Sequence, residues 1–277
     1  MTHQQRRAYR GPLQAIIFDW AGTTVDYGSM APVVVFREVF RQHGVEITIE
    51  EARAPMGLAK KDHIREVTEM ERVAACWQEV HGRACTPADI DAMYADFVPL
   101  QLDVLISHAG VIPGTVDAVA ACRERGLRIG STTGYTRSMM DILVPAAARQ
   151  GYAPDACLCP SDVPAGRPAP WMCFLNAMQL NVYPMAACVK VGDTLADIAE
   201  GLNANMWTIG VVRTGNELGM TEAEVAALSP DDLERRLEPI RRRFLQSGAH
   251  FVADSVADVP RIIDDIAASL EQGVAPI

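Results

Sequence analysis

Short runs of continuous apolar residues alternate with segments of helical periodicity along most of this chain. The runs are 13–18, 127–133, 156–159, 188–191 and 207–212. Continuous hydrophobicity over a few residues is typical of a parallel strand that is buried on both faces. The helical segments that alternate with them are 115–125, 136–150, 171–180 and 195–203. Strands that alternate with helices form βαβ units, so we predict an α/β fold with a parallel sheet covered by helices on both faces.

One long stretch interrupts this alternation. Residues 28–106 contain helix signals but no convincing strand, and Thr48 with Glu51 three residues later is the signature of a helix N-terminus. The sequence on both sides of the stretch belongs to one sheet. We therefore predict two domains, a core formed by 1–27 and 107–277 and an all-helical domain inserted at 28–106. Further expected elements are helices at 31–42, 61–68, 71–80, 87–106, 222–227, 231–245 and 255–269 and a short strand at 250–253.

Charge limits the kinds of partner that the chain can bind. Its 277 residues include 25 Lys and Arg against 35 Asp and Glu, a formal net charge of −10. An acidic chain is a poor ligand for nucleic acid or for an anionic membrane, since both need a basic face. No apolar run approaches the ~20 residues of a membrane span. An anionic small-molecule substrate must therefore be held by a local arrangement of groups.

Cysteine usage indicates the compartment. The chain has 7 cysteines, an odd number, and no CxxC motif. This pattern fits reduced thiols better than a disulfide framework or a structural zinc site. Residues 1–7 show no apolar segment of a secretion signal. We expect a soluble, cytoplasmic protein.

Polar motifs lie at or just beyond the carboxyl ends of predicted strands, where open α/β sheets bind ligands. Asp19 ends the first strand, Thr133 ends the second, Arg167 follows the third, and Asp193 and Asp197 follow the fourth. One carboxylate can attack phosphorus, a second can help to hold Mg²⁺, and a hydroxyl and a guanidinium can bind phosphoryl oxygens. Each motif alone is common in turns and helix caps. Their joint order favours a site for phosphoryl transfer.

In this order the motifs resemble those of the haloacid dehalogenase superfamily: DxDGT, then a Ser or Thr, a Lys or Arg, and an acidic motif such as GDxxxD. The inserted helical stretch looks like that superfamily's cap domain, so the resemblance implies a Rossmann-like core with a helical cap. Ala21 stands where most phosphatases of the superfamily have a second Asp, which protonates an oxygen leaving group. The resemblance therefore puts ordinary phosphomonoester hydrolysis in doubt.

The resemblance narrows to the phosphonoacetaldehyde hydrolases, or phosphonatases, and covers nearly the full chain. The segments that carry it are FDWAGTTVDYG at 18–28, EARAPMGLAKKDH at 51–63, GSTTGYTR at 130–137 and DVPAGRP at 162–168. It implies cleavage of the C–P bond of phosphonoacetaldehyde to acetaldehyde and phosphate, in the degradation of 2-aminoethylphosphonate. It also implies a homodimer.

The implied chemistry depends on a lysine. A C–P bond has no oxygen leaving group, and departure of a free carbanion is prohibitively unfavourable. A protonated imine on the neighbouring aldehyde is an electron sink, so the departing carbon leaves as an enamine. Lys60 aligns with the family's Schiff-base lysine, and Asp19 aligns with its nucleophile. Because these residues belong to different predicted domains, we expect the domains to close, with hinges near Tyr27 and His108.

Further roles also follow from the resemblance. It assigns Mg²⁺ to the carboxylates of Asp19 and Asp193 and to the main-chain carbonyl of Ala21. Asp197 is expected to support the metal site or Arg167 from outside. The residues expected to complete the site are Thr133 and Arg167 on the phosphoryl group, and Met56, His63 and Tyr135 near the lysine, where they handle water and protons.

Three alternatives stay open. A capped phosphatase that acts on a small phosphate ester is the nearest, and Ala21 and Lys60 argue against it. A lysine-dependent aldolase or lyase would use Lys60 but would leave Asp19 and Arg167 without a role. A noncatalytic Mg²⁺-binding interaction domain would not explain Lys60.

Overall fold

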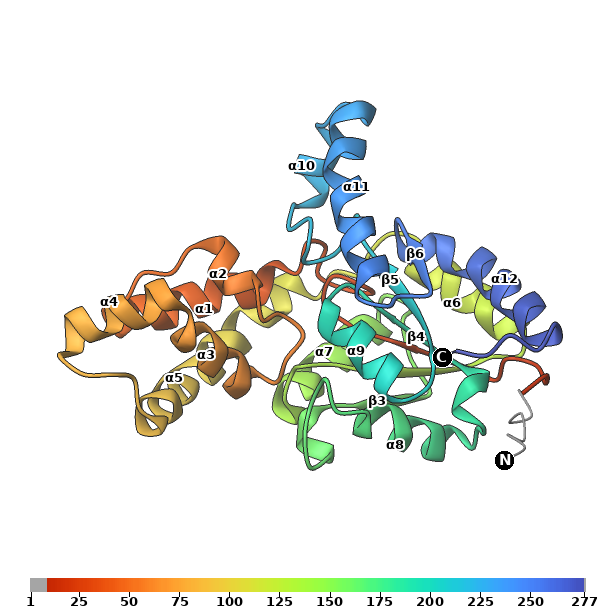
Figure 1. The fold of residues 1–277 in the computed structure, drawn as a ribbon, viewed down its shortest axis with the longest axis horizontal. Coiled ribbons are helices and arrows are strands. Elements are labelled where there is room, and N and C mark those ends of the chain that lie inside the picture. The colour runs from red at the N-terminus through yellow and green to blue at the C-terminus, as the bar shows by residue number, and fades with distance from the viewer. Residues whose placement is uncertain (1–8, 277) are drawn as a thin grey trace, which may run out of the picture.

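A computed structural model describes residues 9–276, so the segment 1–7, in which we expect no secretion signal, lies outside the described residues. Its centre is a six-stranded parallel sheet of order β3-β2-β1-β4-β5-β6 (Figure 1). The strands are β1 (Ala15–Phe18), β2 (Arg128–Thr132), β3 (Ala156–Leu158), β4 (Cys188–Gly192), β5 (Trp207–Val211) and β6 (Phe251–Ala253). Every predicted strand is present, and the predicted parallel sheet is confirmed.

Helices cover both faces of this sheet. Side chains of β1 alternate between the faces: Ile16 and Phe18 pack into one apolar cluster, and Ala15 and Ile17 pack into another. The first cluster includes residues of α6 (Thr115–Glu124), α7 (Arg137–Ala148) and α12 (Val259–Glu271). Opposite them, α8 (Trp171–Leu180) packs on the second cluster and α9 (Leu195–Asn203) lies against β4 and β5. The predicted two-sided covering is confirmed.

Five helices follow one another between β1 and β2 before α6 begins. They are α1 (Met30–Gln42), α2 (Ile49–Arg53), α3 (Lys60–Glu69), α4 (Glu71–His81) and α5 (Pro87–Leu105). All of residues 30–105 are described and contain no strand, and in Figure 1 the helices gather on the left, away from the sheet. The helix signature at Thr48 is confirmed, since the Glu51 amide donates to Thr48 Oγ1 at 3.1 Å and the Thr48 amide donates to Glu51 Oε2 at 2.8 Å.

The two places where the chain passes between the sheet and these helices lie side by side. Val25 and Val111 form an antiparallel bridge, and the Asp26 amide donates to the Gly110 carbonyl at 3.0 Å. Asp26 also stabilises the first turn of α1, because its carboxylate accepts hydrogen bonds from the backbone amides of Met30 and Ala31 at 3.1 and 3.0 Å. The predicted hinge residues Tyr27 and His108 flank this paired crossing.

The C-terminal region departs from the prediction at one point. The expected helix 255–269 is wrong at its start, where a 3₁₀ turn (Val256–Asp258) precedes α12. The Ser255 amide donates to Asp258 Oδ2 at 3.0 Å, and this local bond stabilises the tight turn. Helices α10 (Glu222–Ala226) and α11 (Pro230–Gln246) form as expected and project from the core in Figure 1. Within residues 9–276 no helix combines the length and apolar character needed to cross a membrane.

Candidate active site

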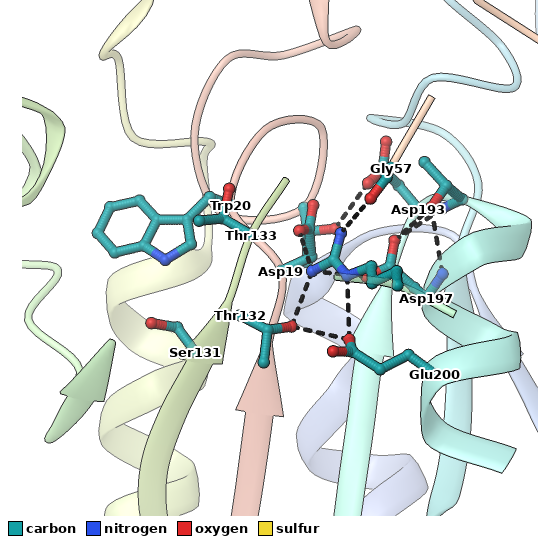
Figure 2. Close-up of polar contacts among 12 residues, drawn as sticks. Asp19, Trp20, Gly57, Ser131, Thr132, Thr133, Asp193, Asp197 and Glu200 are labelled. Carbon is teal, nitrogen blue, oxygen red and sulfur yellow. Dashed lines mark hydrogen bonds and ion pairs between the residues drawn. The ribbon is translucent and has the colours of Figure 1, made fainter. Parts of the chain in front are cut away.

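Three buried carboxylates meet at the carboxyl ends of the central strands. Asp19 follows β1 and Asp193 follows β4, and the pairing of these strands brings the two residues together. Asp197 lies in the first turn of α9, directly after β4. Carboxylate oxygens of all three lie within 4.8 Å of one another. Figure 2 shows the three residues gathered above the strand ends. The sequence prediction that these acids share one edge of the sheet is therefore correct.

The electrostatics of this cluster suit a cation. Burial raises the pKa of Asp19, and Asp197 raises it further; burial raises the pKa of Asp193 well above its ordinary value, with Asp19 adding to the effect. For Asp197, the charges of Arg167 and Lys190 outweigh burial and hold the pKa below its ordinary value. Carboxylate oxygens are the ligands that hard divalent cations prefer. The donor set thus fits a divalent metal ion, whose charge would favour the ionised form of all three acids.

Asp193 is held by two groups that the sequence analysis did not identify. Thr23 Oγ1 donates to Asp193 Oδ1 at 3.1 Å, and the backbone amide of Asn216 donates to Asp193 Oδ2 at 2.7 Å. Thr23 was within reach of sequence reasoning, because it belongs to the same motif as Asp19. Asn216 lies in the loop after β5 and no local pattern marks it.

Arg167 is the centre of a buried polar network. Its Nη2 donates to Asp19 Oδ1 at 2.6 Å and to Thr132 Oγ1 at 2.7 Å, and its Nε donates to Glu200 Oε2 at 2.9 Å (Figure 2). Asp197 Oδ1 lies 3.1 Å from the same Nη2. These contacts fix the guanidinium against the Asp19 carboxylate, so the candidate anion-binding group is oriented in advance.

Two charged members of this network were missed. Lys190 lies in the middle of β4. Its Nζ lies 2.6 Å from Asp197 Oδ1 and 3.7 Å from Glu200 Oε2. Glu200 follows Asp197 by three residues on α9 and so shares its face. That spacing, together with one lysine inside the apolar run 188–191, was an available signal for both residues.

Thr132 and Thr133 are adjacent in sequence, but their side chains have different contacts. Thr132 contacts Arg167 and Glu200. Thr133 Oγ1 accepts a hydrogen bond from the Tyr135 amide at 3.1 Å and lines the cavity described below.

Lys60 begins α3 and is a buried residue, with 5% relative exposure. Its Nζ lies 4.7 Å from the centre of the Tyr135 ring and 5.5 Å from that of Phe36. Burial lowers the pKa of Lys60 to about 8; Asp19 opposes the shift and Arg167 adds to it. Lys61 does not share this position, because it is half exposed and pairs with Asp91. The cation that assists Lys60 is therefore Arg167 and not its sequence neighbour.

One small cavity of about 20 Å³ brings the two regions together. Lys60 and Met56 line it from the helical stretch, and Asp19 and Arg167 line it from the sheet. The helical stretch approaches the sheet closely at Gly57, whose φ is +93° and where an added Cβ would lie 2.3 Å from Thr194 Oγ1. A larger cavity between α3, α4 and the start of α5 contains none of the candidate site residues.

Two further residues near Lys60 are held in their neutral forms. The His63 ring stacks on Phe36 with centroids 3.7 Å apart, and His63 Nε2 lies 3.0 Å from the Ala52 carbonyl. Burial lowers the pKa of His63 well below its ordinary value, and Lys60 lowers it further. Burial raises the pKa of Tyr135 well above its ordinary value. Neither His63 Nδ1 nor the Tyr135 hydroxyl has a hydrogen-bond partner within the described chain.

Comparison with known proteins identifies the family. Residues 13–205 match the family model of haloacid dehalogenase-like hydrolases. A phosphonoacetaldehyde hydrolase-like protein of Syntrophobacter fumaroxidans is 57% identical over 97% of both chains, and a phosphonoacetaldehyde hydrolase of Bacillus cereus is 52% identical over 92% of this chain and 96% of its own. This chain belongs to the phosphonoacetaldehyde hydrolase family. A solved structure of a phosphonoacetaldehyde hydrolase-like protein from Oleispira antarctica, 39% identical, covers all of both chains with a TM-score of 0.96.

Most of the predicted site residues lie around one cavity. The predicted residues that line the shared cavity are Asp19, Ala21, Met56, Lys60, Thr133, Tyr135 and Arg167. Asp193 and Asp197 lie beside Asp19, as described above. His63 is buried near Lys60 but is not among the residues that line the cavity.

Proposed function

We propose that this protein hydrolyses the C–P bond of phosphonoacetaldehyde to acetaldehyde and phosphate, with Lys60 as the imine-forming amine and Asp19 as the nucleophile. The observation that carries the proposal is the shared cavity, in which a buried lysine of lowered pKa faces Asp19 and Arg167. An amine that is partly neutral near pH 7 can attack an aldehyde, and a carboxylate held by a guanidinium can attack phosphorus.

The proposed reaction begins with imine formation. The neutral Lys60 amine adds to the aldehyde, and the adduct takes up a proton and loses water, which yields a protonated imine. Asp19 attacks phosphorus while the electrons of the C–P bond pass into an enamine. Water then hydrolyses the aspartyl phosphate, the enamine carbon takes up a proton, and a second water releases acetaldehyde and the free amine.

Arg167 and Thr133 are proposed to bind the phosphoryl group. Arg167 is fully buried and already contacts Asp19, so its charge lies where the anionic group must approach the nucleophile. Thr133 lines the same cavity. Both residues would bind the anionic phosphoryl group, which the net negative charge of the chain would otherwise repel.

The divalent ion of this site is proposed to be Mg²⁺, held by the carboxylates of Asp19 and Asp193 and the main-chain carbonyl of Ala21. The oxygen-only donor set supports this choice. When bound, the ion offsets the repulsion between a phosphoryl group and the carboxylates. Asp197 is proposed to support the site indirectly, since it pairs with Lys190 and Arg167.

Met56, His63 and Tyr135 are proposed to handle water and protons around Lys60. His63 is suited to orient a water molecule, because burial keeps its ring neutral and its Nδ1 has no hydrogen-bond partner within residues 9–276. Met56 and the Tyr135 ring exclude bulk water from the imine.

We also propose that residues 28–106 act as a cap that closes on the core formed by 1–27 and 107–277. The paired crossing at Val25 and Val111 supports a hinge near Tyr27 and His108. The assembly is proposed to be a homodimer that works in the cytoplasm; all seven cysteines are free, which fits a reducing compartment. Analytical ultracentrifugation tests the dimer.

The test of the function is simultaneous assay of both products. The purified protein with Mg²⁺ and phosphonoacetaldehyde is expected to release phosphate and acetaldehyde in equal amounts, and Asp19→Asn is expected to release neither. Phosphate release from simple esters without turnover of the phosphonate would instead favour the phosphatase alternative.

A further inference from the structure

Arg53 joins the helical stretch to the core at a point outside the cavity. It is the last residue of α2, seven positions before Lys60. Its Nη1 donates to the carbonyl of Gly28 at 2.9 Å and to the side-chain oxygen of Asn216 at 3.0 Å, and its Nη2 donates to the carbonyl of Gly219 at 3.2 Å. One guanidinium therefore holds the crossing before α1 and the loop after β5 together.

The contact with Asn216 runs in both directions. While Arg53 donates to Asn216 Oδ1, Asn216 Nδ2 donates to the main-chain carbonyl of Arg53 at 3.2 Å. The backbone amide of Asn216 in turn donates to Asp193 Oδ2 at 2.7 Å. A continuous chain of hydrogen bonds thus leads from the end of α2 to a carboxylate of the metal site.

Packing leaves the Arg53 side chain little freedom. Gly219 has a φ of +63°, and an added Cβ there would lie 2.7 Å from Arg53 Nε. The Nη1 and Nη2 donors of Arg53 meet neutral acceptors, whereas its Nε is buried without a hydrogen-bond partner among residues 9–276. Within the same residues no carboxylate lies in ion-pair distance of the guanidinium. Such an arrangement depends on the planar geometry of the guanidinium and not on charge alone, so lysine cannot reproduce it.

We propose that Arg53 is a positioning residue. Through Asn216, it couples the placement of segment 54–60 on the core to the orientation of the Asp193 carboxylate. Residues 54–59 connect Arg53 directly to Lys60, so the same clamp that fixes the Asn216 loop also anchors the segment that carries the amine. The inference rests on the proposed function for the role of Lys60, but the link to Asp193 stands on the geometry of this chain.

The test uses Arg53→Lys, Asn216→Ala and the variant that carries both changes. Arg72→Lys is measured beside them. Arg72 is a matched control, because it contacts Glu46, Glu51 and Cys76 within the helical stretch only. Two readouts are measured: Mg²⁺ affinity of the substrate-free protein by calorimetry, and the rate at which acetaldehyde with cyanoborohydride labels Lys60. Circular dichroism confirms that each variant is folded.

We expect Arg53→Lys and Asn216→Ala each to weaken Mg²⁺ binding about tenfold, as loss of a group that orients a metal ligand does. Each is also expected to slow labelling of Lys60 several-fold, and the double variant is expected to be little worse than either single variant, since both break one chain of contacts. Arg72→Lys is expected to match the unaltered protein.

Mg²⁺ affinity within twofold of the unaltered protein in both single variants would overturn the proposal, as would effects that simply add. If Arg53→Lys fails to fold, Asn216→Ala decides alone, because its backbone amide to Asp193 is retained. Absence of any Lys60 labelling in the unaltered protein would contradict the proposed function, whereas the Mg²⁺ titration would still test the Arg53 link.

Discussion

The amine of Lys60 lies 4.7 Å from the centre of the Tyr135 ring, inside the cavity that also contains Asp19. Attraction between a cation and an aromatic face favours the protonated amine, but burial opposes it more strongly, and the pKa of Lys60 falls to about 8. At pH 7 about one tenth of Lys60 is then neutral, against about one part in 2,500 for an ordinary lysine. Burial therefore leaves part of the Lys60 amine unprotonated near neutral pH.

The first prediction is a pH profile for imine formation. The rate at which aldehyde and cyanoborohydride label Lys60 is expected to rise with pH and to reach half its maximum near pH 8, the pKa that burial sets. Mass spectrometry of the Lys60 peptide measures this rate. A midpoint above pH 10 would show that Lys60 behaves as an ordinary solvated lysine.

The second prediction concerns stability. The unfolded chain, with a lysine pKa of about 10.4, binds more protons than the folded chain between about pH 8 and 10. Burial of the charged amine therefore destabilises the fold below pH 8, and this penalty disappears as pH rises. Lys60→Met is expected to raise the free energy of unfolding by roughly 1–3 kcal/mol at pH 7 and by less at pH 10. Urea denaturation at both pH values measures it, and an equal or lower stability at pH 7 would contradict the expectation.

The third prediction tests the buried network around Arg167. Glu200→Gln removes the carboxylate that accepts from Arg167 Nε, and leaves buried Arg167 and Lys190 with less compensating charge. We expect a loss of about 3 kcal/mol in the free energy of unfolding and a fall of at least tenfold in kcat. Asp264→Asn is the control, because the exposed pair Arg125–Asp264 is worth at most about 1 kcal/mol. Equal effects from the two variants would remove the reason for giving Glu200 a role.

The fourth prediction concerns leaving groups. Because Ala21 cannot protonate a departing oxygen, esters with a poor leaving group such as glycerol phosphate lack general acid catalysis, which is worth about 10²–10⁴ in rate. We expect kcat/KM for such esters to lie at least 10³-fold below that for phosphonoacetaldehyde. Comparable values would support a phosphatase.

The sequence predicted those parts of the molecule that depend on local pattern. Continuous apolar runs identified every strand, and position at strand ends identified Asp19, Asp193 and Asp197 as neighbours. Residues whose roles arise from tertiary contact were not found. Lys190 lies inside the apolar run of β4, and only the structure shows that it pairs with Asp197.

Adjacent residues were also hard to separate. Thr132 and Thr133 are both in one motif, and only the direction of each side chain shows that Thr132 contacts Arg167 while Thr133 lines the cavity. Asn216 carries no pattern at all, since its importance comes from a backbone amide that the fold brings to Asp193. The start of α12 was wrong because a local Ser255–Asp258 bond favours a 3₁₀ turn there.

An imine on Lys60 can be trapped by borohydride reduction in the presence of phosphonoacetaldehyde and located by mass spectrometry. We expect inactivation with a single adduct on Lys60 and no phosphate release by Lys60→Arg. Lys61→Arg is expected to behave normally, because the Lys61 side chain pairs with Asp91 outside the cavity. An adduct on another residue, or full turnover by Lys60→Arg, would contradict an imine on Lys60.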